Sequence, residues 1–228
     1  MTIVSIHQPN YLPWLGYFRK IAQSDVFVFY DNVQMPMGKS LVTRNRFKSA
    51  QGSKWLTVPS KKSGTPGLIG ETEFVPGNWQ AKHLGSLRNW YAGSQCLDDV
   101  LDILIDSFNE DGTKISDLNI QLIKSFCEFV GIRDTRFVVS SQMRHGETGS
   151  ASISPILSEL DASVYLTGQG AGSMRHLDTE ELSRLGIETR FLSTTFAAYP
   201  QRHGDFEPNL SAIDALLNVG PSAFLGLL

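Results

Sequence analysis

The chain has 228 residues, of which 41% are hydrophobic and 19% charged, the composition of an ordinary globular protein. Its net charge of −3 and isoelectric point near 5.9 exclude bulk electrostatic binding of nucleic acid. No apolar run approaches membrane-spanning length and no signal-like region precedes the first predicted strand, so we expect a cytoplasmic protein without a membrane span. The cysteines, Cys96 and Cys127, show no metal-ligand or redox spacing, which agrees with a reducing compartment.

The opening of the chain predicts a strand, a helix and a second strand. Ile3 to Ile6 is a β-branched run without charge, and Val26 to Tyr30 is apolar on both faces, as strands of a covered parallel sheet are. Between them, Trp14 to Ala22 places apolar residues close to helical spacing. Together they predict a βαβ unit, whose strands end at one edge of the sheet, where ligands of open α/β sheets bind.

Polar side chains follow both predicted strands. His7, Gln8 and Asn10 come after the first strand, and Asp31 follows the second. We therefore expect an imidazole, amides and a carboxylate to converge at one edge of the sheet, with His7 as a general base or ligand.

Two aromatic residues, Tyr11 and Trp14, lie in the proline-stiffened turn after His7. They are candidate substrate contacts. The alternative is that both rings fill the bottom of the core while His7 only caps backbone groups.

A β-hairpin is predicted next. Leu41 to Phe47 alternates loosely, and Lys54 to Val58 follows after a glycine-containing turn. In such a strand Arg44 and Arg46 share one face, and Asn45 lies on the other.

The paired arginines suit bidentate recognition of a phosphate or carboxylate, and Lys39 adds a cation just before the strand. The alternative is a solvated edge-strand face, where cations discourage pairing with other chains. Closeness in sequence to the edge formed by His7 and Asp31 favours the anion site. The polar run from Ser60 to Gly67 is a predicted flexible loop and a candidate lid.

Three amphipathic helices are predicted at Trp79 to Tyr91, Leu97 to Phe108 and Ile115 to Val130, with Gly131 as the last C-cap. They carry few convergent polar groups, so we interpret them as packing elements. The predicted fold class is α/β, a mostly parallel sheet flanked by helices, with a β-hairpin and a helical insertion. We expect a single domain over residues 1–228, with a candidate helical subdomain at 79–131.

The second half predicts further strand and helix pairs. The expected strands and helices lie at 136–141, 152–160, 163–167, 178–185, 187–191 and 210–218, and a short strand at 71–74 precedes the helices. The exit of the first strand makes Ser141, Arg144 and His145 candidate contacts. Gly168 and Gly170 begin a glycine-rich turn that could offer backbone N–H groups to an anion, or form only a tight turn.

The motif His7-Gln-Pro-Asn-Tyr-Leu-Pro-Trp-Leu-Gly-Tyr17 resembles the opening of the WbqC-like family of bacterial proteins. Four later stretches match the same family pattern in the same order, at 43–48, 55–59, 165–170 and 206–214. Members of that family occur among genes for O-antigen and other surface-polysaccharide assembly. The resemblance implies a role in that synthesis, and glycine or other aminoacyl transfer onto an amino sugar is the reaction suggested for it.

The expected function is therefore a transferase acting on a small anionic or nucleotide-linked sugar. His7 would act as general base, and Asp31 would orient it or hold substrate. The expected substrate contacts are Gln8, Asn10, Tyr11, Trp14, Lys39, Arg44, Asn45, Arg46, Gly168 and Gly170. The alternative is a non-catalytic sugar- or glycan-binding module. The sequence contains no metal-binding cluster and identifies neither a cofactor, nor the donor, nor the oligomeric state.

Overall fold

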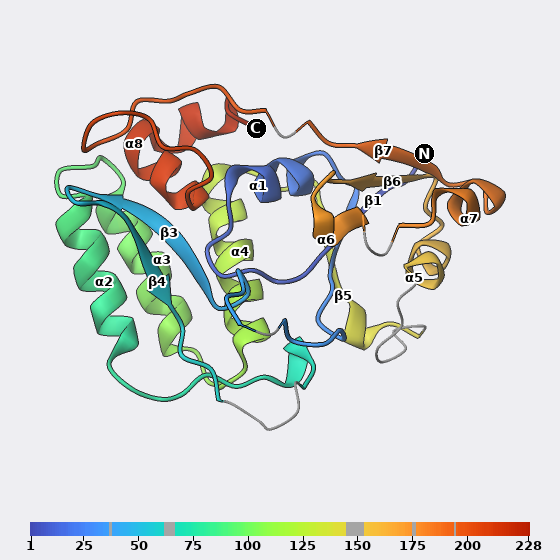
Figure 1. The fold of residues 1–228 in the computed structure, drawn as a ribbon, viewed down its shortest axis with the longest axis horizontal. Coiled ribbons are helices and arrows are strands. Elements are labelled where there is room, and N and C mark those ends of the chain that lie inside the picture. Colours follow the sequence, from blue (N-terminus) through green and yellow to red (C-terminus); the bar gives the residue numbers. More distant parts are fainter. Residues whose placement is uncertain (37, 62–66, 145–152, 175–176, 194) are drawn as a thin grey trace.

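The computed structural model of the chain describes residues 1–36, 38–61, 67–144, 153–174, 177–193 and 195–228. They form a parallel sheet of five strands in the order β5-β2-β1-β6-β7 (Figure 1). These strands are β1 (Ile3–His7), β2 (Val26–Phe29), β5 (Arg136–Val139), β6 (Val164–Thr167) and β7 (Glu188–Phe191). The predicted α/β fold class is confirmed.

The central strand is β1, and the sheet extends from it on both sides. The chain first builds β2 and β5 on one side, and then returns to lay β6 and β7 on the other. The strand order therefore reverses between β1 and β6. In open α/β sheets, ligands bind outside the carboxyl ends of the strands at such a switch point. His7 is the last residue of β1, so the topology places it there.

Helices cover both faces of the sheet, because successive side chains of a strand point to opposite faces. Phe27 and Phe29 join a large hydrophobic cluster with side chains of α1, α4 and α8, whereas Val26 and Val28 join a smaller cluster with side chains of α5 and α7. These helices are α1 (Leu15–Ala22), α4 (Ile115–Val130), α5 (Ser154–Glu159), α7 (Thr179–Arg184) and α8 (Ala212–Leu225). In the described part of the chain, no helix combines the length and apolar character needed to cross a bilayer.

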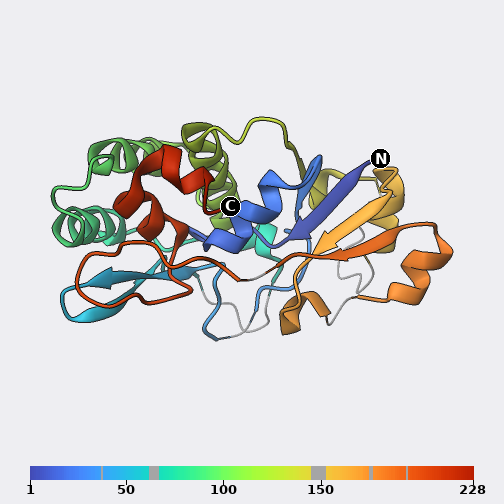
Figure 2. The same ribbon diagram turned by 90° about the horizontal axis from the view of Figure 1, so that it is seen from above.

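The predicted hairpin is confirmed as a separate antiparallel sheet of β3 (Arg44–Ser49) and β4 (Gly52–Thr57). The predicted helices are α2 (Trp79–Trp90), α3 (Leu97–Asn109) and α4. Figure 2 shows the hairpin, α2 and α3 at one end of the molecule, and β6, β7 and α7 at the other. Apolar residues of α2, α3 and α4 belong to the same cluster as Phe27 and Phe29, so residues 79–131 share their core with one face of the sheet.

Two segments differ from the predicted elements. Residues 71–74 form no extended strand and follow a single 3₁₀ turn, η1 (Ile69–Glu71), with only isolated bridges to neighbouring segments. The last helix is interrupted after its predicted range, 210–218, because Gly220 adopts a non-helical φ of 78°, and Pro221 begins a second helical segment that runs to Leu225. The short elements η2 (Ser140–Gln142) and α6 (Ala171–Met174) follow β5 and β6.

A buried carboxylate fastens the 199–209 loop to the core. Asp214, in the first turn of α8, is 0% exposed and accepts hydrogen bonds from Tyr91 (2.6 Å), Tyr199 (2.8 Å) and Gln201 (3.0 Å). Lys48 Nζ donates to the same Gln201 side chain at 3.2 Å. The network joins β3, the end of α2, the loop and α8. A buried carboxylate with this many donors is stabilising only while its donors remain in place.

Asp214→Ala should lower the free energy of unfolding by about 3 kcal/mol or more, since the buried hydroxyls of Tyr91 and Tyr199 lose their acceptor and Gln201 loses one of its own. Urea denaturation followed by far-UV circular dichroism measures this loss. The matched control is Asp102→Ala, an exposed site on α3, which should stay within about 0.5 kcal/mol of the wild type. Equal losses in the two variants would contradict the role given to this network.

Candidate functional site

The turn after β1 is held by hydrogen bonds to its backbone carbonyls. Asn119 on α4 donates to Pro9 O at 2.8 Å, while Asn45 and Ser211 donate to Leu12 O at 2.7 and 2.8 Å. Leu12 has a φ of 41°, a conformation that is strained for a non-glycine residue. The hairpin, the helical insertion and α8 therefore fix the turn from three directions, and with it the position of His7.

This arrangement corrects two predicted substrate contacts. Tyr11 is 0% exposed and its hydroxyl is hydrogen-bonded to His83 Nδ1 at 2.8 Å. Asn45 uses its amide nitrogen on Leu12 O and its carbonyl oxygen on the backbone N–H of Arg46. The polar groups of both side chains are hydrogen-bonded within the protein, so we interpret Tyr11 and Asn45 as structural residues. Asn10 is also buried.

His7 is partly exposed and sits against two aromatic rings. Its ring centroid lies 5.4 Å from that of Trp14 and 4.9 Å from that of Tyr17, in edge-on geometry. Gly16 lets Trp14 pack closely, because a Cβ there would lie 2.7 Å from Trp14 Nε1. The alternative core-filling role of Tyr11 thus holds, whereas Trp14 keeps a partly exposed surface beside His7.

The protonation state of His7 follows from its contacts. Nδ1 lies 3.1 Å from the carbonyl of Gln8, which can only accept, so Nδ1 carries the proton and Nε2 presents a lone pair. Burial and the charge of Lys20 lower the pKa of His7 to about 3. The imidazole is therefore neutral at pH 7 and able to accept a proton or a hydrogen bond at Nε2.

Lys20 is a site residue that the sequence analysis missed. It lies on α1, is 3% exposed, and its charge reaches His7 strongly enough to lower the histidine pKa. Its one signal in the sequence is its position three residues after Tyr17, on the side of α1 that faces the sheet.

Asp31 follows β2 as predicted but does not orient His7. Its carboxylate accepts hydrogen bonds from Ser140 Oγ (2.9 Å), and from Ser141 N (2.9 Å) and Oγ (2.7 Å), at the exit of β5. Gly70 packs against the same carboxylate, since a Cβ there would lie 2.8 Å from Oδ2. Asp31 is turned towards β5, away from β1. No hydrogen bond among the described residues joins Asp31 to His7, and its alternative role of holding substrate stays a prediction.

The arginine face of the hairpin is confirmed by the strand register. Arg44 pairs with Thr57 and Arg46 with Trp55, so both arginines project on the face that carries the Trp55 ring. The Arg44 guanidinium lies 3.9 Å from the Trp55 ring centroid, whereas Arg46 forms a 3.3 Å ion pair with Glu207. Arg44 makes no ion pair with any described residue. Of the two arginines, Arg44 is the one without a carboxylate partner among the described residues, and the predicted anion clamp stays a prediction.

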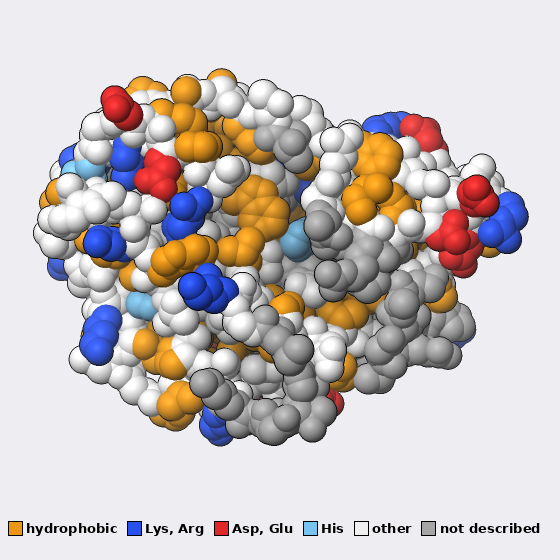
Figure 3. Space-filling view, viewed as in Figure 1, with side chains coloured by type: hydrophobic (Ala, Val, Ile, Leu, Met, Phe, Trp, Pro, Cys, Tyr) orange, Lys and Arg blue, Asp and Glu red, His pale blue; other side chains and the backbone are white. Residues whose placement is uncertain are grey.

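A groove of about 560 Å³ lies between β4 and α2, beside this face. Its lining is aromatic and cationic, without a carboxylate: Lys54, Trp55, Leu56, Thr57, Trp79, Lys82, His83, Ser86 and Trp90. Figure 3 shows Lys and Arg side chains over the hairpin and α2, with hydrophobic side chains between them. The groove therefore combines stacking surfaces with positive charge, which suits a sugar or an acidic glycan.

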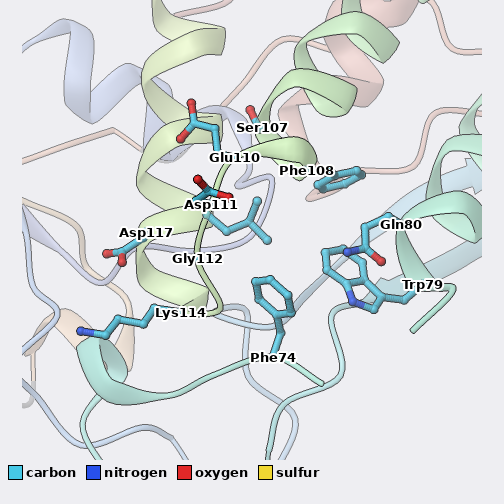
Figure 4. A pocket seen from close by; sticks show the side chains of 11 residues that line it. Phe74, Trp79, Gln80, Ser107, Phe108, Glu110, Asp111, Gly112, Lys114 and Asp117 are labelled. Atoms are coloured by element: carbon cyan, nitrogen blue, oxygen red, sulfur yellow. The ribbon is translucent and has the colours of Figure 1, made fainter. Parts of the chain in front are cut away.

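A second hollow lies beside the N-terminus of α2 and shares Trp79 with the groove. It encloses about 40 Å³ and is bordered by Phe74, Trp79 and Phe108, with Glu110, Asp111 and Asp117 at its rim (Figure 4). No group of histidine, cysteine or carboxylate side chains among the described residues could hold a metal ion. This hollow is too small for a substrate-sized molecule.

The remaining predicted substrate contacts are the glycine turn after β6, Lys39 and Gln8. Neither Gly168 nor Gly170 has a positive φ, so the turn does not form the alternating backbone nest that binds anions. β1 and β6 pair in parallel at Ile3 opposite Val164 and at Val4 opposite Tyr165, so Gly168, directly after β6, lies at the same carboxyl edge of the sheet as His7. Lys39 is exposed and Gln8 partly exposed. His145 and most of the predicted lid, residues 62–66, lie outside the described residues.

The buried histidines predict a loss of stability in mild acid. Burial lowers the pKa of His83 to about 4, against 6.5 in the unfolded chain. As the pH falls from 6.5 towards 4, the unfolded chain binds a proton that folded His83 does not, so stability falls. His83→Gln should flatten the pH dependence of the free energy of unfolding by up to about 1.4 kcal/mol per pH unit near pH 5.

Urea denaturation at half-unit pH intervals measures this slope. His7 acts in the same direction and is present in both proteins, so its contribution cancels in the comparison. Exposed His203→Gln is the matched control, with the wild-type slope expected. An unchanged slope in His83→Gln would contradict the burial argument.

Comparison with known proteins identifies the family of the chain. The WbqC-like protein family matches residues 8–225, from the residue after His7 to the end of α8. The chain is 32% identical over 226 residues, 98% of its length and 96% of the relative's, to the uncharacterized protein Rv1507c of Mycobacterium tuberculosis. No solved structure matches it. Since the match covers nearly the whole chain, the protein belongs to the WbqC-like family.

Proposed function

We propose that the protein is a transferase that modifies an anionic, nucleotide-linked sugar in surface-polysaccharide synthesis, with an aminoacyl group such as glycine as the transferred unit. The observation that supports this is the placement of neutral His7 at the carboxyl end of the central strand, at the switch point between β1 and β6. A partly exposed imidazole there, with a free Nε2 and a buried cation behind it, suits proton removal from a bound nucleophile.

In such a transfer, the sugar amine or hydroxyl attacks the carbonyl carbon of the donor. The new bond to the carbonyl carbon forms, the bond to the leaving group breaks, and the proton of the nucleophile passes to His7 Nε2. It is then returned to the leaving group or to water. The low pKa of His7 makes it a weak base in the empty site, but a bound anion beside it raises that pKa. Substrate binding would therefore activate the base.

His7→Ala should lower turnover by about 10²–10⁴-fold, the usual contribution of a general base, with an unchanged far-UV circular dichroism spectrum. The assay incubates the protein with UDP- or dTDP-linked amino sugars and glycine, with ATP or coenzyme A, and detects the product by its mass. His203→Ala, an exposed histidine at the far end of α2, is the matched control and should keep wild-type turnover. Near-normal turnover in His7→Ala would remove His7 from the mechanism.

The second candidate is a glycan-binding module, supported by the groove between β4 and α2. Trp55 is 44% exposed, unusual for so large an apolar ring, and its partner Arg44 adds positive charge. An aromatic platform beside cations is suited to an acidic sugar chain.

Under this alternative, Trp55→Ala should weaken binding of an acidic oligosaccharide by about tenfold, the value of one stacking contact of roughly 1.4 kcal/mol. Isothermal titration calorimetry measures the affinity. Phe191→Ala on β7, an aromatic residue of similar exposure, is the control and should bind normally. If the protein is a glycan-binding module, Trp55→Ala should lose oligosaccharide binding and His7→Ala should bind normally. No transfer product should form in either variant. Unaltered binding in Trp55→Ala would exclude the groove.

A further inference from the structure

The side of α1 that faces the sheet carries a cation without a counterion. Lys20 is 3% exposed, and among the described residues its ammonium forms neither an ion pair nor a hydrogen bond. The nearby polar groups of its own helix and of β1 are otherwise engaged: Tyr17 donates to Gln8 O, and Ser24 donates to Ser5.

The ammonium points to the edge of the sheet where His7 lies. Side chains of an α-helix lean towards its N-terminus, and α1 follows β1 in a βαβ unit, so its N-terminus lies at the carboxyl end of β1. Tyr17, one helical turn before Lys20 on α1, packs its ring 4.9 Å from that of His7, so this side of the helix faces the histidine. The lowering of the His7 pKa by the charge of Lys20 agrees with this placement. Lys20 and His7 therefore face the same spot at the switch point.

A buried ammonium without a partner is unfavourable, and a protein retains one at a cost in stability. Burial lowers the pKa of Lys20 to about 8, so the group is still mostly charged at pH 7. Asp31 and Asp214, the buried carboxylates of the described chain, already accept hydrogen bonds from serines and from tyrosines respectively. Neither carboxylate pairs with Lys20, so a bound anionic ligand can serve as its counterion.

We propose that Lys20 binds the phosphate group of a sugar phosphate, while His7 accepts the hydrogen bond of an amine or hydroxyl on the same sugar. A lysine recognises phosphate as a point charge, and the lone pair on His7 Nε2 requires a donor rather than a second anion. Gly168 follows β6 at the same carboxyl edge of the sheet as His7, and it carries no side chain that could occupy that edge. The partly exposed rings of His7 and Trp14 mark the side from which it enters.

This inference rests on the proposed function for the identity of the substrate and names the group that anchors it. A sugar linked through phosphate to a nucleotide carries both required features, an anion and a neighbouring hydroxyl or amine. Free phosphate and a nucleoside diphosphate share the anion but lack the second sugar that follows the phosphate, so the three ligands separate the contributions of Lys20 and His7.

The test compares inorganic phosphate, UDP, UDP-N-acetylglucosamine and uncharged uridine by thermal shift and isothermal titration calorimetry at pH 7. The wild type should bind UDP-N-acetylglucosamine more tightly than UDP, and uridine should cause no shift. In Lys20→Met, a change to an apolar side chain of similar length, affinity for the three phosphate-containing probes should fall at least tenfold. In Lys124→Met, an exposed lysine on α4, affinity should be unchanged.

Lys20→Met should also keep or raise the melting temperature without ligand, since it removes a buried unpaired charge. If the variant does not fold, nuclear magnetic resonance of the wild type with ¹³C-methylated lysines gives the answer. Phosphate binding should raise the pKa of Lys20 from about 8 towards its usual 10.5, and an unmoved pKa with bound phosphate would overturn the proposal.

The outcomes separate this inference from the transferase proposal. Equal phosphate affinity in Lys20→Met and wild type, or no binding of any phosphate probe by the wild type, overturns the anion site. UDP-sugar binding that is lost in Lys20→Met supports the anion site even if no transfer product is ever found. Product formation by Lys20→Met at the wild-type KM would leave the transferase standing and overturn the role of Lys20.

Discussion

The backbone carbonyls of Pro9 and Leu12 accept hydrogen bonds from side chains that lie far away in the sequence, and the rest of the structure is assembled around those bonds. A proline-rich turn has few N–H groups of its own, so its buried carbonyls need donors from elsewhere. Asn119 supplies one from α4, and Asn45 and Ser211 supply others from the hairpin and from the start of α8. The helical insertion and the hairpin therefore help to hold the turn after β1, and with it His7, in place.

Charge is distributed unevenly across the interior. Asp31 and Asp214 each accept several hydrogen bonds, so their charges are satisfied within the protein. Lys20 has no such partner among the described residues, and it lies next to a histidine kept neutral by burial. An interior that satisfies its anions and leaves one cation unpaired is electrostatically complementary to an anionic ligand. Retaining that cation is a cost to stability that a binding site explains.

The two candidate binding surfaces are connected through one buried hydrogen bond. Tyr11 belongs to the turn after His7, and its hydroxyl is bonded to His83, which lines the groove between β4 and α2. The carboxyl end of β1 offers a cation and a neutral imidazole, which are groups suited to chemistry on a phosphorylated sugar. The groove offers Trp55 and Arg44, which are suited to holding a longer saccharide. A transferase that acts on a growing glycan would use both surfaces, and a binding module would use the groove alone.

The sequence by itself determined the local elements and the position of His7. The apolar run Val26–Phe29 and the helical stripes at 79–131 are local patterns, and such patterns predicted strands and helices to within a few residues. The motif that follows β1 indicated a site there. Only the tertiary structure decided which polar groups are free. Asp31 is bound by serines that follow β5 and Tyr11 by His83, whereas Lys20 has no partner in the part of the chain that the structure describes, because hydrogen-bond partners distant in sequence are brought together only by the fold.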